Sequence, residues 1–393
     1  MKKLLVLSFI IVNGMTAACS GDTDPVRSGA DQMDKYLHLI GGKQIALVAN
    51  HTSVVGDHHL VDTLLASGIG KDQIMKVFAP EHGFRGDNAA GVQIEDGTDP
   101  LTGIPVASLY GSHKKPEARE LAGIDLILFD LQDVGARFYT YISTLHYVME
   151  ACAENEIPLI LLDRPNPNGG YVDGPVLDTA FRSFVGMHPI PVVYGLTIGE
   201  LAGMINGEGW LNGGISCDLT VISCEGYYHG KSYSMPVSPS PNLANDHSIL
   251  LYPSTCFFEG TVLSEGRGTS MPFEVYGHPE LSGGFSFTPE AIEGVARNPK
   301  FEGQRCYGAD LREFSPEEGW TRIHLQFILE AYKDFPRKEE FFTSFFSTLA
   351  GTDKLRKMVE DGWDEERIRA SWQTDLAKYK LKRREYLIYE DSK

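Results

Sequence analysis

The feature that most constrains the fold is a series of short, almost wholly apolar runs. They are QIALVAN (44–50), IMKVFAP (74–80), IPVASLYG (104–111), DLILFDLQD (125–133), IPLILLD (157–163) and DLTVIS (218–223). Strands of a parallel sheet that is covered on both faces read in this way, whereas strands with one wet face alternate apolar and polar residues. We therefore predict an α/β fold with a Rossmann-like parallel sheet.

The segments between these runs carry helical signals. Residues 59–70 form an apolar pattern closed by glycine, and residues 140–156 place apolar side chains at helical spacing. The segment 197–210 opens on a threonine cap, Thr197, with Glu200 three residues further on. No GxGxxG motif follows the first apolar run, so the predicted fold brings no dinucleotide site with it. We expect neither a cofactor nor a metal ion.

The proline-rich stretch MPVSPSPNLAND (235–246) interrupts this pattern. We place a domain boundary there, with a Rossmann-like catalytic domain over 35–236 and a smaller α+β domain over 237–393. We expect helices at 323–333 and 352–360 and a closing helix in the tail, and an active-site cleft between the two domains.

The first residues have the pattern of an export signal. MKKLLVLSFIIVNGMTAACS combines two lysines, an apolar core and small residues before Cys19. The end of this segment is similar to a bacterial lipoprotein processing site, so we expect a signal peptide over 1–19, a lipidated Cys19 and a flexible tether over 20–34. The alternative is plain secretion after cleavage near Ala18. Either way, the protein is expected to be exported, as a periplasmic protein or an outer-membrane-anchored lipoprotein.

The net charge of the chain limits the classes of partner that we expect it to bind. The formal net charge is −18, and a field of that sign repels nucleic acid and anionic lipid. We expect no nucleic-acid partner, and contact with a membrane only through the N-terminal lipid. A glycan substrate is compatible with this charge.

Polar side chains stand at the end of successive apolar runs. Because ligands of an open parallel sheet bind outside the carboxyl ends of its strands, we expect these side chains to form one site. The candidate residues are Asn50, Glu81, His82, Arg85, Asp130, Gln132, Asp133, Arg137, Tyr139, Arg164 and Asn166. Glu81 directly follows Pro80 at the end of an apolar run, which suits a general acid.

Several of these residues also have a structural interpretation. Asp130 could pair with Arg137 or Arg164, or cap the following helix, as could Asp163. Asn50 and Asn166 could hold turns, and His82 could support a neighbour rather than touch a ligand.

A second polar cluster lies beyond the predicted boundary, in FFEGTVLSEGRGTSMPFE (257–274). This glycine-rich loop could close over a sugar, with Arg267 pairing an acidic substituent. The alternative is a structural ion pair between Glu265 and Arg267.

Five motifs in order, APEHGFRG, FDLQDVGARFYTY, DRPNPNGG, GLTIGELA and LSEGRGT, resemble the NamZ family of exo-β-N-acetylmuramidases, formerly a domain family of unknown function. The resemblance runs from about residue 35 to the end of the chain. It implies a Rossmann-like domain, a smaller C-terminal domain and a cleft between them. It further implies release of N-acetylmuramic acid from the non-reducing end of peptidoglycan fragments, in cell-wall turnover. The glutamate of the EHG motif, the family's proposed catalytic residue, is Glu81 here.

Glycoside hydrolysis usually needs two carboxyl groups. Glu81 is the expected acid, and Asp133, Asp130, Glu265 or the acetamido group of the substrate could fill the second role. The lactyl carboxylate of muramic acid requires a cation, for which the candidates are Arg85, Arg137, Arg164 and Arg267. The competing interpretations are a metal-dependent hydrolase with ligands from His82, Asp130, Asp133 and Asp163, and a non-catalytic glycan-binding lipoprotein.

Overall fold

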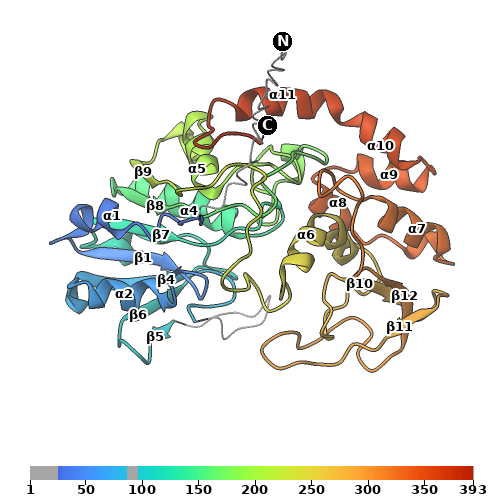
Figure 1. Cartoon of the computed structure of the whole chain (residues 1–393), viewed down its shortest axis with the longest axis horizontal. Coiled ribbons are helices and arrows are strands. Elements are labelled where there is room, and N and C mark those ends of the chain that lie inside the picture. Colours follow the sequence, from blue (N-terminus) through green and yellow to red (C-terminus); the bar gives the residue numbers. More distant parts are fainter. Residues whose placement is uncertain (1–24, 86–95, 393) are drawn as a thin grey trace, which may run out of the picture.

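The first part of the chain is built on a seven-stranded sheet, seen in the computed structural model, which describes residues 25–85 and 96–392 (Figure 1). The strand order is β5-β6-β4-β1-β7-β8-β9, and every pair is parallel except β5 with β6. The strands are β1 (Ile45–Ala49), β4 (Ile74–Ala79), β5 (Gly97–Thr98), β6 (Pro105–Ser108), β7 (Leu126–Asp130), β8 (Leu159–Leu162) and β9 (Leu219–Ile222). Numbered along the chain, the six parallel strands have the order 3-2-1-4-5-6, which is that of Rossmann folds. The predicted fold class is confirmed.

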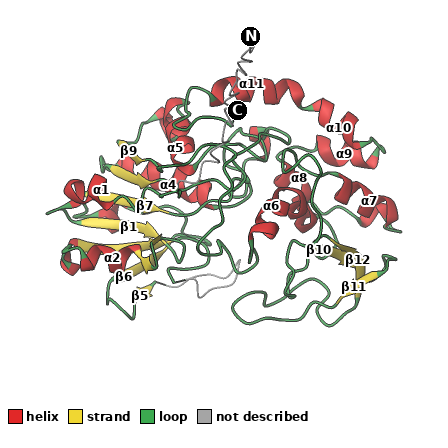
Figure 2. Cartoon of the chain, in the orientation of Figure 1, coloured by secondary structure: helices red, strands yellow, loops and turns green. Residues whose placement is uncertain are grey.

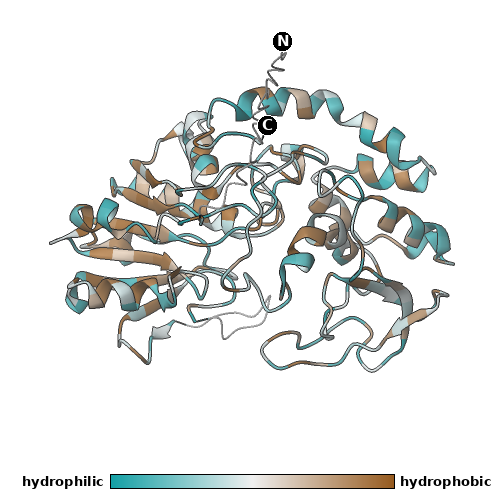
Figure 3. Ribbon diagram, in the orientation of Figure 1, coloured by the Kyte–Doolittle hydropathy of each residue, from teal (hydrophilic) through white to brown (hydrophobic). Residues whose placement is uncertain are grey.

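Helices cover both faces of this sheet. Strand β7 shows why: Leu126 and Leu128 belong to one buried cluster, while Ile127 and Phe129 belong to another. The first cluster includes side chains of α1 (Met33–Ile40) and α2 (Leu60–Ala66), and the second includes side chains of α4 (Tyr141–Glu154) and α5 (Ile198–Gly207). Two short elements, the hairpin β2 (Val54–Val55) with β3 (His58–His59) and the helix α3 (Ala118–Leu121), complete this part. Much of the sheet is correspondingly hydrophobic (brown in Figure 3), and β1 and β8 are apolar along their whole length.

The second part begins with α6 (Asp246–Thr255) and carries a small antiparallel sheet in the order β10-β12-β11 (Figure 2). Its strands are β10 (Val275–His278), β11 (Phe285–Phe287) and β12 (Cys306–Asp310). Its helices are α7 (Gln326–Asp334), α8 (Phe345–Ala350), α9 (Lys354–Glu360), α10 (Glu365–Ser371) and α11 (Gln373–Arg383). This is the smaller α+β part that we predicted after the proline-rich stretch.

The C-terminal tail returns to the first part of the molecule. The phenol of Tyr379 in α11 donates to the carbonyl oxygen of Tyr194 over 2.7 Å. The phenol of Tyr389 donates to Oδ2 of Asp163 over 2.6 Å and accepts from the backbone N–H of Cys224 over 2.8 Å. The last segment of the second part therefore packs against the first part and is hydrogen-bonded to it near the end of β8.

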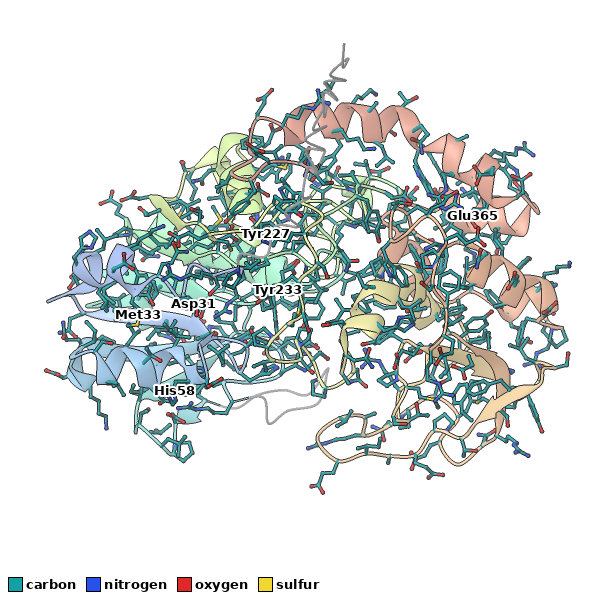
Figure 4. All side chains as sticks on the ribbon, viewed as in Figure 1. Asp31, Met33, His58, Tyr227, Tyr233 and Glu365 are labelled. Carbon is teal, nitrogen blue, oxygen red and sulfur yellow. The ribbon has the colours of Figure 1, made fainter. Side chains whose placement is uncertain are left out.

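Residues 25–34 also differ from the expected flexible tether. The side-chain amide of Gln32 donates to the carbonyl oxygen of Ser223 over 2.7 Å, and Ser28 and Ala30 are buried. Gly29 fits so closely that a Cβ atom there would lie 2.2 Å from the carbonyl oxygen of Ile222. Figure 4 places Asp31 within the first part, where its carboxylate accepts from the backbone N–H of Ser28. This segment is part of the fold because it covers the end of β9.

Residues 1–24, with the predicted signal peptide, Cys19 and the start of the tether, lie outside the described residues. Within residues 25–85 and 96–392, none of the helices combines the length and the apolarity that a membrane crossing requires.

Candidate active site

A cavity of about 830 Å³ lies between the two parts of the molecule, where we predicted a cleft. The first part contributes Glu81, His82, Tyr110 and residues 138–141 to its wall. The second part contributes Glu259, Arg267, Phe273 and residues 295–299. The volume falls within the range of roughly 300–1,000 Å³ typical of small-molecule sites.

Glu81 reaches this cavity because the chain turns sharply after β4. His82 and Gly83 both have left-handed backbone conformations, with φ of 74° and 79°, and the N–H of Gly83 donates back to the carbonyl oxygen of Pro80 over 3.1 Å. A left-handed conformation at a histidine is uncommon and concentrates at functional sites. The turn leaves Glu81 half-buried at the end of the strand and His82 buried beside it.

Two hydroxyl groups contact the Glu81 carboxylate. The hydroxyl of Thr140 donates to Oε2 over 3.0 Å, and the phenol of Tyr110 lies close to the same carboxylate. Burial raises the pKa of Tyr110 above its ordinary value, and the adjacent negative charge of Glu81 raises this pKa further. Tyr110 therefore keeps its proton at neutral pH.

Two tyrosines form an aromatic wall next to Glu81. Tyr139 and Tyr141 pack edge to face with their ring centroids 4.8 Å apart. The phenol of Tyr139 donates to the carbonyl oxygen of Pro239 over 2.6 Å, which ties the wall to the linker before α6. The phenol of Tyr141 accepts from Nδ2 of Asn50 over 2.6 Å. Tyr139 thus lines the cavity as predicted, whereas Asn50 is buried behind it and positions Tyr141.

The second part brings an ion-pair network to the opposite wall. Nη2 of Arg267 lies 2.6 Å from Oε1 of Glu259, and its Nε lies 3.3 Å from Oε1 of Glu265. Nζ of Lys300 lies 3.1 Å from the other oxygen of Glu265. Arg267 and Glu259 line the cavity, but Glu265 is buried behind them. The Glu265–Arg267 pair that we considered as the structural alternative is therefore present.

Asp130 and Arg164 form a buried ion pair that does not line the cavity. Nε of Arg164 lies 2.6 Å from Oδ1 of Asp130, and Nη2 lies 2.8 Å from Oδ2. The same Nη2 donates to the carbonyl oxygen of Val54 over 2.9 Å. We expected both residues to contact the substrate. Instead, their ion pair connects the ends of β7 and β8.

Asp133 and Gln132 are also turned inward. Oδ2 of Asp133 accepts from the phenol of Tyr194 and from the N–H of Gly135, and burial raises the pKa of Asp133 to about 6. The side-chain amide of Gln132 donates to the carbonyl oxygens of Asp133 and Pro165, each over 2.8 Å. Neither side chain lines the cavity. Asp133, which we predicted as a reacting group, is therefore not placed to contact the substrate.

The remaining candidates hold loops in the same manner. Arg137 is fully buried and donates to four carbonyl oxygens, those of Pro175, Ile190, Leu349 and Ala350. Burial lowers the pKa of Arg137 to about 9.

Asn166 donates to the carbonyl oxygen of Leu196 over 2.8 Å and accepts from the N–H of Asn168 over 2.8 Å. Arg85 pairs with Asp62 and Asp99 and does not line the cavity. We expected substrate contacts from Arg85, Arg137 and Asn166. The structure instead gives all three a role in holding loops, because the loops after the strands need internal hydrogen bonds to stay folded.

Sequence reasoning missed many residues of the cavity wall, among them Tyr110, Thr140, Glu259 and Arg297. Tyr110 stands near the end of the run 104–111 and could have been found by the strand-end rule that found Glu81. Arg297 stands in an irregular loop, where no periodic signal exists. Among the described residues there is no group of three or more His, Cys, Asp or Glu side chains that could hold a metal ion.

Comparisons with known proteins agree with this architecture. The family models described as exo-beta-N-acetylmuramidase NamZ, N-terminal and C-terminal, match residues 45–247 and 250–389. The chain is 38% identical over 384 residues to the peptidoglycan beta-N-acetylmuramidase NamZ of Bacillus subtilis (strain 168), covering 93% of this chain and 91% of that protein.

Two crystal structures of DUF1343 family proteins from Bacteroides fragilis NCTC 9343 are also similar. One has a TM-score of 0.86 at 44% identity and covers 94% of this chain and 100% of its own. The other has a TM-score of 0.77 at 26% identity and covers 93% of this chain and 99% of its own.

Proposed function

The chain belongs to the NamZ family of exo-β-N-acetylmuramidases, glycosidases that act on peptidoglycan, and from that premise we propose that Glu81 is its general acid. In this role the carboxyl group of Glu81 protonates the glycosidic oxygen as the bond to a non-reducing terminal N-acetylmuramic acid breaks. The leaving saccharide departs with that proton, and water supplies the hydroxyl group of the released sugar.

The observation that supports this assignment is the position of Glu81 in the cavity wall. Its carboxyl group stands at the end of a sheet strand, is oriented by the hydroxyl of Thr140 and lies close to the phenol of Tyr110. A general acid needs this combination of access to substrate and fixed geometry.

The second carboxyl group needs a new assignment, because Asp130, Asp133 and Glu265 do not line the cavity. Within the described part of the wall, the carboxyl groups are those of Glu81 and Glu259. Glu259, oriented by Arg267, takes the place of the three earlier candidates. Its contribution is tested by Glu259→Gln, which should lower kcat on an activated glycoside if Glu259 acts at the anomeric centre.

Substitution of Glu81 by glutamine tests the general acid. Loss of a general acid should lower kcat by about 10²- to 10⁴-fold on a disaccharide, whose leaving group needs protonation. The loss should be much smaller on an aryl glycoside with an acidic phenol, because that leaving group departs without a proton. Glu317→Gln, at an exposed glutamate outside the cavity, is the matched control. Equal losses on both substrates would reject Glu81 as the acid.

For the location of the protein, the proposal rests on residues 1–19 alone. An export signal ending at Cys19 would deliver the enzyme to the compartment that holds peptidoglycan, with a lipid on Cys19 as its membrane anchor. Replacing Cys19 by alanine should move the exported protein from the membrane to the soluble fraction. An unchanged membrane fraction would contradict lipidation at this residue.

A further inference from the structure

An N-acetylmuramic acid residue brings a lactyl carboxylate into the cavity, and this group needs a cation to replace its lost hydration. The net charge of the chain, −18, opposes the approach of an acidic sugar, so the cation must be local. Each of the four arginines that the sequence suggested for this role is already engaged elsewhere. Arg85 and Arg164 pair with aspartates, Arg137 with carbonyl oxygens, and Arg267 with two glutamates.

Arg297 differs from these four arginines in its position and in its contacts. It lines the cavity and its side chain is exposed. Within residues 25–85 and 96–392, Arg297 has no ion pair with a carboxylate, unlike Arg267 in the same wall. Asn298 next to it also lines the cavity and is exposed, and it adds a side-chain amide. We propose that Arg297 is the residue that reads the lactyl carboxylate of the substrate, an inference that rests on the proposed function.

The segment that carries Arg297 is fixed, as a specificity residue requires. Ile292 and Ala296 exchange backbone hydrogen bonds of 2.8 and 2.9 Å, which closes the turn before the arginine. The carbonyl oxygen of Val295 accepts from Nδ2 of Asn242 over 3.2 Å. The turn is thereby tied to the linker that also holds Tyr139.

The residues that follow Arg297 in the segment are also anchored. Nζ of Lys300 donates to the carbonyl oxygens of Phe258, Thr261 and Leu263 over 2.8 to 3.1 Å. Pro299 packs against Gly268 so closely that a Cβ atom on the glycine would lie 2.7 Å from Cγ of the proline. Arg297 therefore projects from a short stretch that is anchored before and after it, and its guanidinium can form the bidentate contact that suits a carboxylate.

The test compares two aryl glycosides that differ in one charge. The first carries N-acetylmuramic acid, and the second carries the same sugar with its lactyl carboxylate converted to the uncharged primary amide. The wild-type enzyme should prefer the acid. Arg297→Gln should lower kcat/KM on the acid by about 10- to 100-fold, the size expected for a charged hydrogen-bonded contact, and change kcat/KM on the amide by less than about 3-fold. Arg297→Lys should retain part of the preference.

Arg305→Gln provides the matched control, because Arg305 is exposed in the same connection but does not line the cavity. Arg297→Gln should also unfold at the wild-type temperature, since the side chain has no ion pair to lose among the described residues. If Arg297→Gln keeps the wild-type preference for the acid, the inference is overturned. Failure of the Glu81 assignment has a different signature, which is an equal loss of Glu81→Gln on a disaccharide and on an aryl glycoside, and it leaves the comparison of the acid and the amide at Arg297 intact.

Discussion

The hydroxyl of Thr140 donates a hydrogen bond to Oε2 of Glu81 over 3.0 Å. The two residues are 59 positions apart. They meet because β4 ends and α4 begins at the same edge of the sheet. Thr140 is the N-cap residue of α4 without using its side chain for the cap. Its hydroxyl is therefore available to orient the carboxyl group of Glu81.

Replacing Thr140 by valine removes this hydroxyl while keeping the shape of the side chain. We expect kcat to fall by about 10- to 100-fold, the equivalent of a hydrogen bond to a charged group worth about 1.5–3 kcal/mol. Thr140→Ser retains the hydroxyl and should stay within a few-fold of wild type. Steady-state kinetics on the disaccharide check both variants, and equal activity of the two would show that the hydroxyl does not orient Glu81.

The Asp130–Arg164 pair should contribute to stability rather than to the reaction. Asp130→Ala leaves the Arg164 guanidinium buried without its carboxylate, and breaking a buried pair in this way costs about 3–5 kcal/mol. Urea unfolding of the variant measures this loss. Asp310→Ala breaks the exposed pair with Arg312 and should cost less than about 1 kcal/mol. Comparable losses at the two sites would mean that Arg164 finds another partner or water.

The fold was predictable because its signals are local. Each apolar run between residues 44 and 223 became a strand, and Thr197 with Glu200 forms the capping box that opens α5. The tail was not predictable in the same way. Tyr389 meets Asp163 across 226 positions, and nothing in the local pattern specifies that contact.

The site was predictable only in part, for a related reason. The strand-end rule found Glu81, which lines the cavity, and equally Asp130 and Asp133, which do not. Whether a strand-end carboxylate faces a cavity or a neighbouring loop depends on partners such as Arg164 and Tyr194. Those partners lie elsewhere in the sequence. Which of them contacts a given carboxylate is decided only when the whole sheet has assembled.

Asp133 should make stability depend on pH. Burial raises its pKa from 3.8 to about 6, and no hydrogen bond reaches its Oδ1 among the described residues, which leaves that oxygen able to carry a proton. The folded state then holds the proton more tightly than the unfolded state, so stability falls as pH rises from about 4 to about 6. The full cost above pH 6 is about 3 kcal/mol, at about 1.4 kcal/mol for each pKa unit.

Asp133→Asn removes this titration. Urea unfolding of both proteins at several values between pH 4 and 7 should show the variant gaining stability relative to wild type across that window. Any hydrogen bond that the amide makes less well adds an offset that does not change with pH. A difference that is constant from pH 4 to 7 would contradict a raised pKa at Asp133.

Gly135 should be the glycine of the Asp133 loop that tolerates no side chain. Its φ is 76°, and a Cβ atom there would lie 2.0 Å from Oδ1 of Asn166, which two hydrogen bonds hold in place. Gly123 is the matched control, because its φ of 81° is similar but its Cβ would meet no atom within 4 Å. Both alanine variants bear the left-handed backbone cost of about 1–2 kcal/mol. Gly135→Ala adds overpacking of about 1–3 kcal/mol, so urea unfolding should separate the two variants by that amount. Equal stabilities would mean that Asn166 can move aside, and the loop would then be looser than its hydrogen bonds indicate.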